Sequence, residues 1–469
     1  MCCTEYIDIP PKLVRMSEVF SQNGFCVYLV GGAVRDVLLG HRAADFDLAT
    51  DATPQDVSRI FAKVIPTGIA HGTVTVRYAG LSVEVTTFRS EGTYSDGRHP
   101  DSVAFARTIE EDLSRRDFTM NAIAASLPSG KLVDPTGGRA DIEQKLIRAV
   151  GNPVQRFGED GLRPVRAIRF ASQLGFSIEE ATYRAILHPQ SLEKTKCVSR
   201  ERFRDEFCKI LQSEKPSVAL RLLEETGILA FFVPQFTACR GCTQADGRGF
   251  HEFDVADHLF CAVDGAPKDN LIVRLAAFYH DIGKPAARVV EQTEHGQCIH
   301  FHGHDGLSAD TAEQSMRSLK FSNAEVRKVC HLVRHHMINC DASLRDEDIR
   351  RFIVRVGKDN LSELFLLHEA DVYGKHGKKP SENDKEVKLF CQFKARVEEA
   401  LCHPMAFSVK DLAISGDELI AQGVPQGKMV GEILDELFDA VTHDPSVNER
   451  SALQEAAGKL LLKHQGKSG

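Results

Sequence analysis

Hydrophobic and polar positions follow two different rhythms along the chain, and the change comes near residue 154. Before that point, short apolar runs alternate with amphipathic stretches, which predicts a mixture of strands and helices. Beyond it, apolar residues recur with the 3.6-residue period of a helix and the strand signals fade. We therefore predict an α+β chain: a small mixed β-sheet head followed by an all-α neck, a second all-α domain and a helical tail.

The strand signals lie within the first 150 residues. Residues 12–23 are amphipathic and precede Gly24, which predicts a helix that ends at a glycine. An apolar run at 26–30 ends at Gly31-Gly32, which predicts a strand followed at once by a helix to about Leu39. We also predict a helix from Thr53-Pro54, strands at 46–49 and 122–127, and a pair of strands at 73–78 and 82–88 joined by a turn at Ala79-Gly80.

Length and composition are those of a globular protein with several domains. A chain of 469 residues is long enough for three or four domains. Hydrophobic residues make up 42% and charged residues 26%, the range of globular proteins. Because no apolar run approaches about 18 residues and the N-terminus lacks a basic and apolar leader, we expect neither a membrane span nor a secretory signal. The net charge of −8 argues against a surface that is basic everywhere, but local basic patches still permit nucleic-acid binding.

Thirteen cysteines are scattered along the chain without the spacing of a disulfide framework. We expect buried thiols in a reducing cytosol, hence a cytoplasmic protein. Cys239 and Cys242 form a C-x-x-C pair that lacks the second pair of a zinc site, and its role stays open.

Changes of pattern divide the chain into four predicted domains. They are a head at 1–150, a helical neck at 151–235, a histidine-rich helical domain at 250–376 and a helical C-terminal region at 384–469. Twelve of the 19 histidines lie between His251 and His376, a concentration that indicates a metal site.

The head begins with a phosphate-binding pattern. The predicted strand at 27–30 runs into Gly31-Gly32, where a helix begins. Glycines let backbone N–H groups approach a phosphate closely, and the N-terminus of a helix favours an anion. Arg35, one turn into that helix, offers a forked guanidinium to the same anion.

Carboxylates follow about ten residues later. Asp45 and Asp47 are two positions apart, and in a strand such residues share a face. Two carboxylates on one face can hold Mg²⁺ ions, which prefer oxygen ligands. Glu84, on the predicted strand at 82–88, is a candidate third carboxylate.

Two arginine-rich blocks follow. In the first, Arg115–Ala122, arginines stand next to Asp117; taken alone this block is also compatible with a solvated, salt-bridged turn. In the second, Arg156–Phe170, arginines recur at three-residue steps on one broad helical face, with Asp160 one turn before the first of them. The arginines on that face are Arg163, Arg166 and Arg169.

The order of these motifs resembles class II tRNA nucleotidyltransferases, the CCA-adding enzymes, and their sister bacterial poly(A) polymerases. The resemblance covers residues 26–211 almost continuously. The matching motifs are Gly31-Gly32-Ala33-Val34-Arg35-Asp36 with Asp45 and Asp47, Thr67–Val74, Glu84–Arg89, Arg115–Ala122, Asp134–Gly138, Glu159–Arg163 and Arg200–Phe207.

The resemblance implies roles for individual residues. It implies that Asp45 and Asp47 hold two Mg²⁺ ions, with Glu84 beside them, for nucleotidyl transfer from CTP and ATP to the 3′ end of tRNA. It further implies a nucleotide site in which different residues contact the triphosphate, the ribose and the base. Those nucleotide-binding residues are Gly31, Gly32, Arg35, Arg116, Asp117, Asn121, Asp160, Arg163, Arg166 and Arg169.

Hydrogen-bond chemistry supports the base-selecting role of Asp160 and Arg163. Cytosine and adenine each present an exocyclic amine next to a ring-nitrogen acceptor, which an aspartate and an arginine complement. Uracil and guanine present the reverse order and would leave both side chains unpaired, which a hydrogen-bonding site can reject by about 10⁴-fold. Because Pro164 is tolerated in the first turn of a helix, we place the start of this helix near Glu159; Gly161 would weaken a helix there by about 1 kcal/mol.

Two segments help to distinguish CCA addition from poly(A) addition. Ile65–Gly72 has the form seen in CCA-adding enzymes rather than the basic stretch of poly(A) polymerases. Residues 89–107 resemble the flexible loop that switches the site from C to A, although they also read as a plain surface loop. Both favour addition of CCA, with poly(A) or A addition as the alternative.

The histidine-rich segment resembles the HD superfamily of metal phosphohydrolases. The matching residues are His258, His280-Asp281-Ile282-Gly283-Lys284, His304, His335 or His336, and Asp371. The resemblance implies a second divalent metal held by His258, His280, Asp281 and Asp371, with N and O donors. The alternatives are a helical spacer that kept buried histidines, and a phosphohydrolase whose head only binds nucleotide.

The tail at 407–463 is predicted to be helical. Asp411–Asp417 and Gly423–Lys428 with Gly431 resemble the C-terminal tRNA-binding region of the family. Gly427-Lys428 at a helix start is equally an ordinary helix cap.

Overall fold

A computed structural model describes residues 5–43, 45–69, 72–89, 106–244, 253–293, 296–402, 406 and 408–465. The chain divides into two compact units. The first comprises Met1–Pro234 with Ser318–Lys320, and the second comprises Gln235–Arg317 with Phe321–Gly469.

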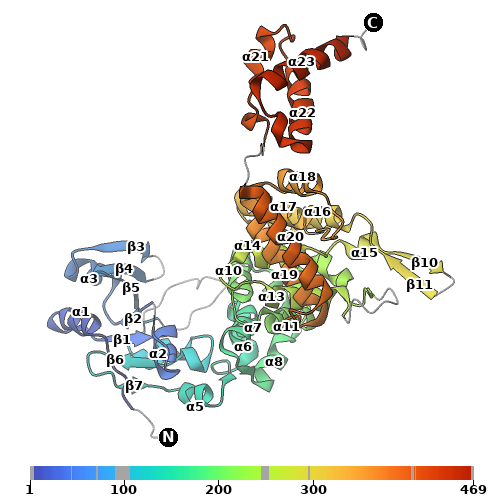
Figure 1. Cartoon of the computed structure of the whole chain (residues 1–469). Helices are drawn as coiled ribbons and strands as arrows, with labels where there is room; N and C mark the ends of the chain where they lie inside the picture. Colours follow the sequence, from blue (N-terminus) through green and yellow to red (C-terminus); the bar gives the residue numbers. More distant parts are fainter. Residues whose placement is uncertain are drawn as a thin grey trace. The chain divides into compact units, whose positions relative to one another are not determined.

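The first unit is built on a seven-stranded mixed sheet with the order β3-β4-β5-β2-β1-β6-β7 (Figure 1). Only β2 and β5 run parallel, and the other neighbouring strands of this sheet are antiparallel. The strands are β1 (Val27–Val30), β2 (Asp47–Thr50), β3 (Val64–Gly68), β4 (Thr73–Tyr78), β5 (Leu81–Thr87), β6 (Ala124–Ser126) and β7 (Leu132–Val133).

The predicted strands of the head are present, and the turn at Ala79-Gly80 joins β4 to β5. β3 was not predicted, because it is short, lacks an alternating pattern of apolar and polar residues and contains Pro66. A proline cannot donate to a strand ladder, so it is tolerated at the edge of a sheet, which is where β3 lies.

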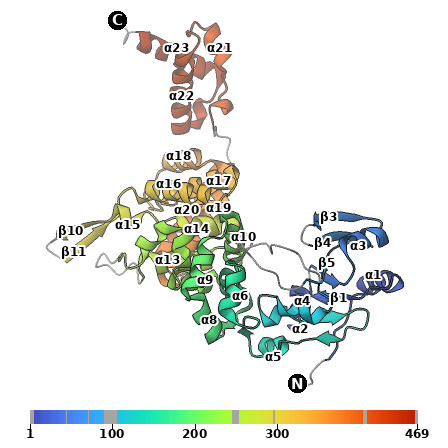
Figure 2. The ribbon, with the colours of Figure 1, turned by 180° about the vertical axis from the view of Figure 1, so that it is seen from behind.

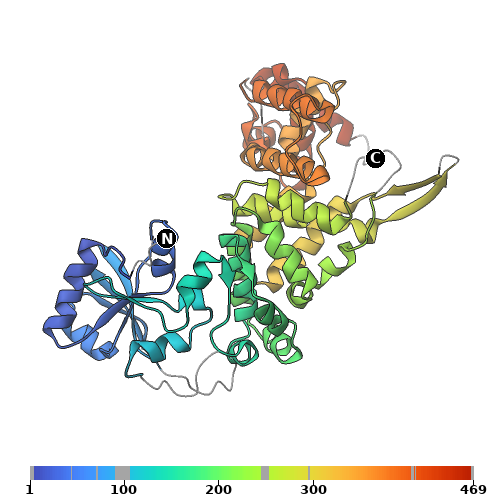
Figure 3. The ribbon, with the colours of Figure 1, turned by 90° about the horizontal axis from the view of Figure 1, so that it is seen from below.

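Five short helices surround this sheet, and Figure 3 shows them with its strands. The segment from residue 153 to residue 232 is almost wholly helical, as its 3.6-residue period predicts; a short parallel pair, β8 (Leu146–Ile147) with β9 (Ser177–Ile178), ties it to the end of the head. The head helices are α1 (Pro11–Gln22), α2 (Gly32–Leu38), α3 (Pro54–Ile60), α4 (Ile109–Ser114) and α5 (Gly138–Glu143). The neck helices are α6 (Pro153–Glu159), α7 (Arg163–Leu174), α8 (Glu180–Ile186), α9 (Pro189–Lys196), α10 (Arg200–Leu211), α11 (Pro216–Glu225) and α12 (Ile228–Phe232).

The second unit is helical apart from one hairpin. β10 (Val289–Thr293) pairs with β11 (Gly296–His300), so the segment predicted to be entirely α-helical contains an antiparallel ribbon that projects from its helices (Figures 1 and 2). Consecutive β-branched residues at Val289-Val290 favour extended backbone. The helices of this segment are α13 (Val255–Gly265), α14 (Leu271–Tyr279), α15 (Lys284–Ala287), α16 (His304–Ser318), α17 (Asn323–Arg334), α18 (Asp346–Val356), α19 (Leu361–His376) and α20 (Lys385–Cys402).

The C-terminal helices α21 (Gly416–Ala421), α22 (Lys428–His443) and α23 (Arg450–Gln465) share a core of their own. Leu419, Ile433, Leu437 and Leu453 are each at most 1% exposed within it. This confirms the helical tail predicted from its apolar period. Among the helices that the structure describes, none is long and apolar enough to cross a membrane.

Candidate active site and metal cluster

Two of the three predicted carboxylates, Asp47 and Glu84, lie on adjacent parallel strands. Asp45 is exposed and lies in a bend before β2, so the prediction that it shares a strand face with Asp47 was wrong. Asp47 opens β2 and is the register partner of Glu84 in β5, so the two side chains are neighbours on one face of the sheet. Partial burial raises the pKa of Asp47, and the charges of Glu84 and Asp45 raise it further, against the opposing charge of Arg116. Crowded carboxylates of this kind fit a divalent cation, which would relieve their repulsion.

The glycine pair lies beside these carboxylates. Gly31 directly follows β1 and has a φ of 71°, a left-handed conformation that glycine adopts without strain. A Cβ at Gly31 would lie 3.2 Å from Arg116 Nη1 and 3.8 Å from Asp47 Oδ2, so this turn, the arginine and the carboxylate adjoin one another. Gly32 then opens α2.

A cavity of about 410 Å³ gathers most of the predicted residues. Five of its lining residues are arginines and four carry carboxylates, so it offers both metal ligands and phosphate-binding charge. The predicted residues that line it are Asp47, Glu84, Arg116, Asp117, Asp160, Arg163 and Arg166, and they are joined by Arg89 and Arg115, which sequence reasoning did not select.

Asp117 is fixed at one end of this cavity by Arg166. Arg166 Nε and Nη2 both donate to Asp117 Oδ2, at 2.9 and 2.6 Å. Burial raises the pKa of Asp117, but the charge and hydrogen bonds of Arg166 outweigh burial and bring that pKa down to about 2. The pair therefore stays ionised, and its orientation is set before any ligand arrives.

The helix predicted to start near Glu159 starts later. α6 ends at Glu159 and α7 begins at Arg163, with Pro164 in its first turn, so Asp160 lies in the break between two helices. Gly161 is required at this break, because a Cβ there would come within 2.2 Å of Lys194 O on α9. The backbone of α9 therefore leaves no room for a side chain at position 161. The hydrophobic pattern of the sequence does not reveal this contact.

Both predicted base-selecting residues are held by partners. Arg163 Nη1 donates to Glu159 Oε2 at 2.6 Å and to the carbonyl of Arg156 at 2.9 Å, and its Nη2 donates to the carbonyl of Arg115 at 3.1 Å. Arg202 Nη2, from α10, donates to Asp160 Oδ2 at 2.7 Å. These contacts orient the two side chains.

Two other predicted nucleotide-binding residues, Arg35 and Arg169, are paired with carboxylates and are not among the residues that line the cavity. Arg35 donates to Asp36 Oδ1 at 2.7 Å and to Asn121 Oδ1 at 2.9 Å, and its side chain is 11% exposed. Arg169 is buried, donates to Glu206 Oε2 at 2.5 Å and lies 3.9 Å from the ring centre of Phe170. Their predicted contact with nucleotide stays a prediction.

Most of the predicted switching loop, residues 90–105, lies outside the described residues. Cys239 and Cys242 are free and buried, as expected of structural thiols, and burial raises the pKa of both.

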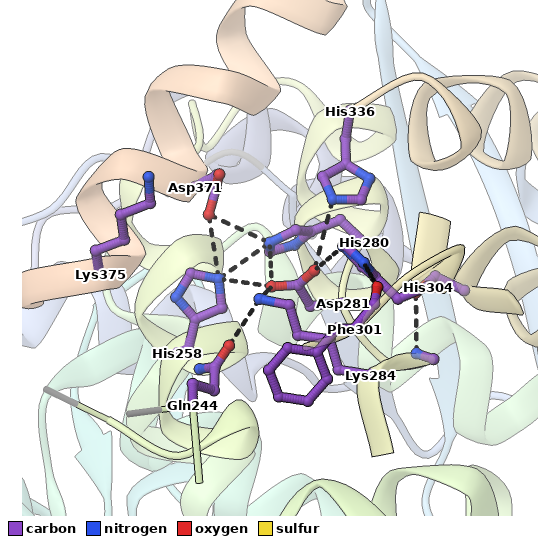
Figure 4. Close-up of polar contacts among 12 residues, drawn as sticks. Gln244, His258, His280, Asp281, Lys284, Phe301, His304, His336, Asp371 and Lys375 are labelled. Atoms are coloured by element: carbon purple, nitrogen blue, oxygen red, sulfur yellow. Dashed lines mark hydrogen bonds and ion pairs between the residues drawn. The ribbon is translucent and has the colours of Figure 1, made fainter. Parts of the chain in front are cut away.

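A second cluster lies within the histidine-rich segment (Figure 4). His258, His280, Asp281 and Asp371 each present a donor atom, and these atoms all lie within 4.8 Å of one another. His258 comes from α13, Asp371 from α19, and the adjacent His280-Asp281 from the end of α14. The N/O donor set fits a divalent metal.

Small residues bring these helices together. α13 and α19 pack closely at Gly374, where a Cβ would lie 3.0 Å from the carbonyl oxygen of His258. Since Asp371 is three residues before Gly374 on the same helix, this contact places its carboxylate 3.2 Å from His258 Nε2. The choice left open between His335 and His336 is also decided, because buried His336 places Nε2 3.5 Å from Asp281 Oδ1.

A cavity of about 730 Å³ in the same unit is lined by Gln244 and Lys375. Lys284 Nζ donates to Gln244 Oε1 at 2.7 Å and forms an ion pair with Asp281 Oδ2 at 2.6 Å, which connects the cavity wall to the cluster. Lysines beside a metal cluster are suited to a phosphate group.

Comparison with known proteins gives three family matches. The "Poly A polymerase head domain" matches residues 27–148, the "Probable RNA and SrmB-binding site of polymerase A" matches 175–240, and the second domain of tRNA nucleotidyltransferases matches 301–457.

Curated relatives and solved structures agree with these matches. The CCA-adding enzyme of Geobacillus sp. (strain WCH70) is 48% identical over 220 residues, which is 47% of this chain and 54% of that protein, so the aligned stretch spans about half the length of this relative. The CCA-adding enzyme of Lactobacillus delbrueckii subsp. bulgaricus (strain ATCC BAA-365 / Lb-18) is 34% identical over 454 residues, covering 94% of this chain and 98% of that protein. The crystal structure of the Bacillus stearothermophilus CCA-adding enzyme in complex with CTP superposes with a TM-score of 0.71 at 28% identity, over 98% of this chain and 100% of that chain.

Proposed function

The chain belongs to the family of CCA-adding enzymes, and we propose from that premise that it adds CCA to the 3′ end of tRNA from CTP and ATP and releases pyrophosphate. The observation that carries the proposal is the cavity in which Asp47 and Glu84 face Arg116, Asp117 and Arg163. The similarity to a structure solved with CTP supports a nucleotide in this cavity. The free thiols of the described cysteines agree with the reducing cytosol that we propose as the compartment.

Each part of the cavity has a task in this reaction. Asp45 and Asp47, with Glu84 beside them, would hold Mg²⁺. Ions bound there would lower the pKa of the tRNA 3′-hydroxyl and neutralise charge on the pyrophosphate leaving group. The Gly31-Gly32 turn offers backbone N–H groups to the triphosphate, and Arg116 supplies positive charge next to it.

The base is selected by side chains rather than by a nucleic-acid template in this proposal. Asp160 accepts from the exocyclic amine of cytosine or adenine, and Arg163 donates to the adjacent ring nitrogen. Because Glu159 and Arg202 hold these two side chains, they are positioning residues for base selection. In the transfer step, the 3′-hydroxyl loses its proton to water, its oxygen forms a bond to the α-phosphorus, and the bond from that phosphorus to pyrophosphate breaks.

Incorporation assays with three tRNA substrates test the proposal. tRNA that ends before CC should take up CTP and then ATP, tRNA that ends after CC should take up ATP alone, and complete tRNA should take up neither. Asp47→Asn should lower incorporation by at least about 10³-fold, since it removes a metal ligand. Glu18→Gln, an exposed change on α1, should leave incorporation unchanged. A long product made from ATP alone would instead identify a poly(A) polymerase.

We propose hydrolysis of phosphate esters as a second activity, carried by the cluster of His258, His280, Asp281 and Asp371. A divalent ion bound there would act as a Lewis acid beside the phosphoryl group. In the reaction, the oxygen of water forms a bond to phosphorus, the P–O bond to the alcohol breaks, and the alcohol leaves with a proton from water. Lys375, which lines the neighbouring cavity, and Lys284, which is ion-paired with Asp281, supply positive charge near the phosphate.

Release of p-nitrophenol from p-nitrophenyl phosphate, with Mn²⁺ supplied, tests this second activity. Asp281→Asn should abolish release, whereas His302→Ala, a nearby histidine outside the cluster, should not change it. Equal rates for Asp281→Asn and the unmodified protein would overturn the proposal.

A further inference from the structure

Asp112 is a buried carboxylate of α4 that contacts three of the five arginines lining the head cavity of about 410 Å³. It is 1% exposed and is not itself among the residues that line this cavity. Its Oδ1 accepts from Arg115 Nε and Nη2, at 3.1 and 2.8 Å, and from the backbone N–H of Arg89, at 3.2 Å. Its Oδ2 accepts from Arg116 Nη2 at 3.1 Å. A single carboxylate therefore joins the segment after β5, where Arg89 lies, to the end of α4.

Asp112 stays ionised in this buried position. Burial raises its pKa, but the charges of Arg115 and Arg116 outweigh burial and hold the pKa below its ordinary value of 3.8. Because the carboxylate is anionic, removing its charge would take away the ion pairs that fix two guanidinium groups of the cavity wall. The position of both groups thus depends on one side chain outside the cavity.

Arg116 connects Asp112 to the carboxylates that would hold metal. Asp112 fixes Nη2 of this arginine, and its Nη1 then faces the turn at Gly31. A Cβ at Gly31 would lie 3.2 Å from that Nη1 and 3.8 Å from Asp47 Oδ2, so the guanidinium lies between the buried carboxylate and the turn. A positive charge held in this place is oriented for a triphosphate before the nucleotide arrives.

The backbone at the end of α4 connects Asp112 to the selection of the base. Arg115 directly follows α4, and Asp112 holds its side chain. The carbonyl oxygen of Arg115 accepts from Arg163 Nη2 at 3.1 Å, and that of Ser114 accepts from Arg156 Nη2 at 3.0 Å. The last carbonyls of a helix favour cations, so the place of this helix end determines where the guanidinium of Arg163 lies.

We propose that Asp112 is a positioning residue for both halves of the nucleotide site. Through Arg116 it orients positive charge for the triphosphate, and through the backbone of Arg115 it orients Arg163 for the base. The inference rests on the proposed nucleotidyl transfer and adds to it a residue that lies outside the cavity. A carboxylate that only stabilised α4 would change the stability of the fold and leave the choice of base unchanged.

Asp112→Asn in the full-length protein tests this role, because it keeps the shape of the side chain and removes its charge. With tRNA that ends before CC, we expect kcat/KM for CTP to fall by about 10²-fold, mainly through kcat. The ratio of kcat/KM for CTP to that for UTP should fall by about tenfold. In an Arg163→Lys background, which lacks Nη2 and its contact with the carbonyl of Arg115, Asp112→Asn should lower kcat without changing the ratio further.

Two matched controls separate positioning from stability. Glu110→Gln removes an exposed carboxylate from the same helix and should change neither kcat nor the ratio. Asp141→Asn removes a carboxylate that is 5% exposed and pairs with Arg148 at 3.1 Å, and it is not among the residues that line the cavity. It should lower the temperature of thermal unfolding and keep the ratio of CTP to UTP. Circular dichroism of each variant shows whether it is folded.

Each other outcome contradicts a specific claim. An unchanged ratio in folded Asp112→Asn, with or without a lower unfolding temperature, would overturn the positioning role. If Asp112→Asn does not fold, Arg115→Lys tests the same link, because it keeps the charge and loses the paired contact of Nε and Nη2 with Asp112; an unchanged ratio there would also overturn it. Absence of CTP incorporation by the unmodified protein would instead refute the proposed nucleotidyl transfer, and this inference with it.

Discussion

At the scale of single residues, the head cavity is organised by buried carboxylates that receive arginines. Asp112 is 1% exposed and accepts from Arg115 and Arg116, and Glu206 is 3% exposed and accepts from Arg169. The carboxylates already hold these arginines in position, so binding of a charged ligand requires little rearrangement of the arginine side chains. Substitutions of single side chains therefore test the ion pairs of this cavity and the selection of the base.

Asp117→Asn tests the ion pair with Arg166 through the pH dependence of stability. Folding lowers the pKa of Asp117 from its ordinary value of 3.8 to about 2, so its stabilising effect is complete above pH 4 and is lost as pH falls through about 2. We expect the variant to lose about 2 kcal/mol of unfolding free energy at pH 5, and the deficit to shrink by about 1 kcal/mol at pH 3. Urea unfolding at both pH values measures this. A deficit that stays constant with pH would contradict it, and Glu143→Gln, at an exposed carboxylate on α5, serves as the control.

Arg202→Met tests whether orientation of Asp160 sets base selection. Loss of the 2.7 Å contact leaves the carboxylate held, among the described residues, only by the backbone N–H of Leu162, at 2.9 Å from Oδ1, so its orientation is less fixed and uracil is rejected less strongly. We expect the ratio of kcat/KM for CTP to that for UTP to fall by about tenfold, equivalent to about 1.4 kcal/mol. Arg184→Met, which removes an exposed ion pair on α8, should leave the ratio unchanged. A uniform loss of activity with an unaltered ratio would point to a purely structural role for Arg202.

At the scale of elements, local pattern and tertiary contact contribute differently. Helices and central strands follow their apolar periods, so β1, β4, β5 and the neck helices were predictable. The break between α6 and α7 was not, because it depends on the backbone of α9 next to Gly161. Edge strand β3 and the β10–β11 hairpin carry too few buried positions for a strand signal. The segments that carry the potential metal ligands were predictable from the sequence. Packing of α13 against α19 brings the donor atoms of His258 and Asp371 within 4.8 Å of each other.

A pair of glycine substitutions tests this packing. Gly374→Ala places a Cβ 2.9 Å from Ala262 Cβ and 3.0 Å from the carbonyl of His258, so we expect thermal unfolding to begin several degrees lower and Mn²⁺ affinity of the cluster to fall. Gly458→Ala, in exposed α23 with nothing within 4 Å of the new Cβ, should stabilise its helix by about 0.5–1 kcal/mol. Calorimetry of both full-length variants provides the measurement. Equal behaviour of the two variants would show that close approach of α13 and α19 is unimportant.

At the scale of the whole molecule, the chain comprises two compact units, each with its own charged site. The carboxylates of the head belong to the first unit, and the histidine cluster belongs to the second. Since the described residues of the head cavity all belong to the first unit and those of the histidine cluster all belong to the second, the two proposed activities should be separable.

Substitutions in one unit are therefore expected to spare the activity of the other. Asp47→Asn should abolish nucleotide incorporation and keep release of p-nitrophenol within about twofold, while His280→Ala should do the reverse, because substitutions in sites that share no residues act additively. Both activities of each full-length variant are measured in parallel. Loss of both activities in either variant, with circular dichroism unchanged, would show coupling between the units.

The sequence by itself determined the order of the motifs, the α+β head with a helical remainder, and the chemistry available: carboxylates for metal, arginines for phosphate and histidines for a second metal. The shared face of the helical arginines follows from spacing, because residues three apart in a helix lie on one face. The two-residue strand period did not apply to Asp45, which precedes β2. Only the tertiary structure decided which partners orient Asp160 and Arg163, that His336 rather than His335 faces Asp281, and that both oxygens of Asp281 face histidine nitrogens. Those outcomes depend on the approach of helices distant in the chain, which no local period encodes.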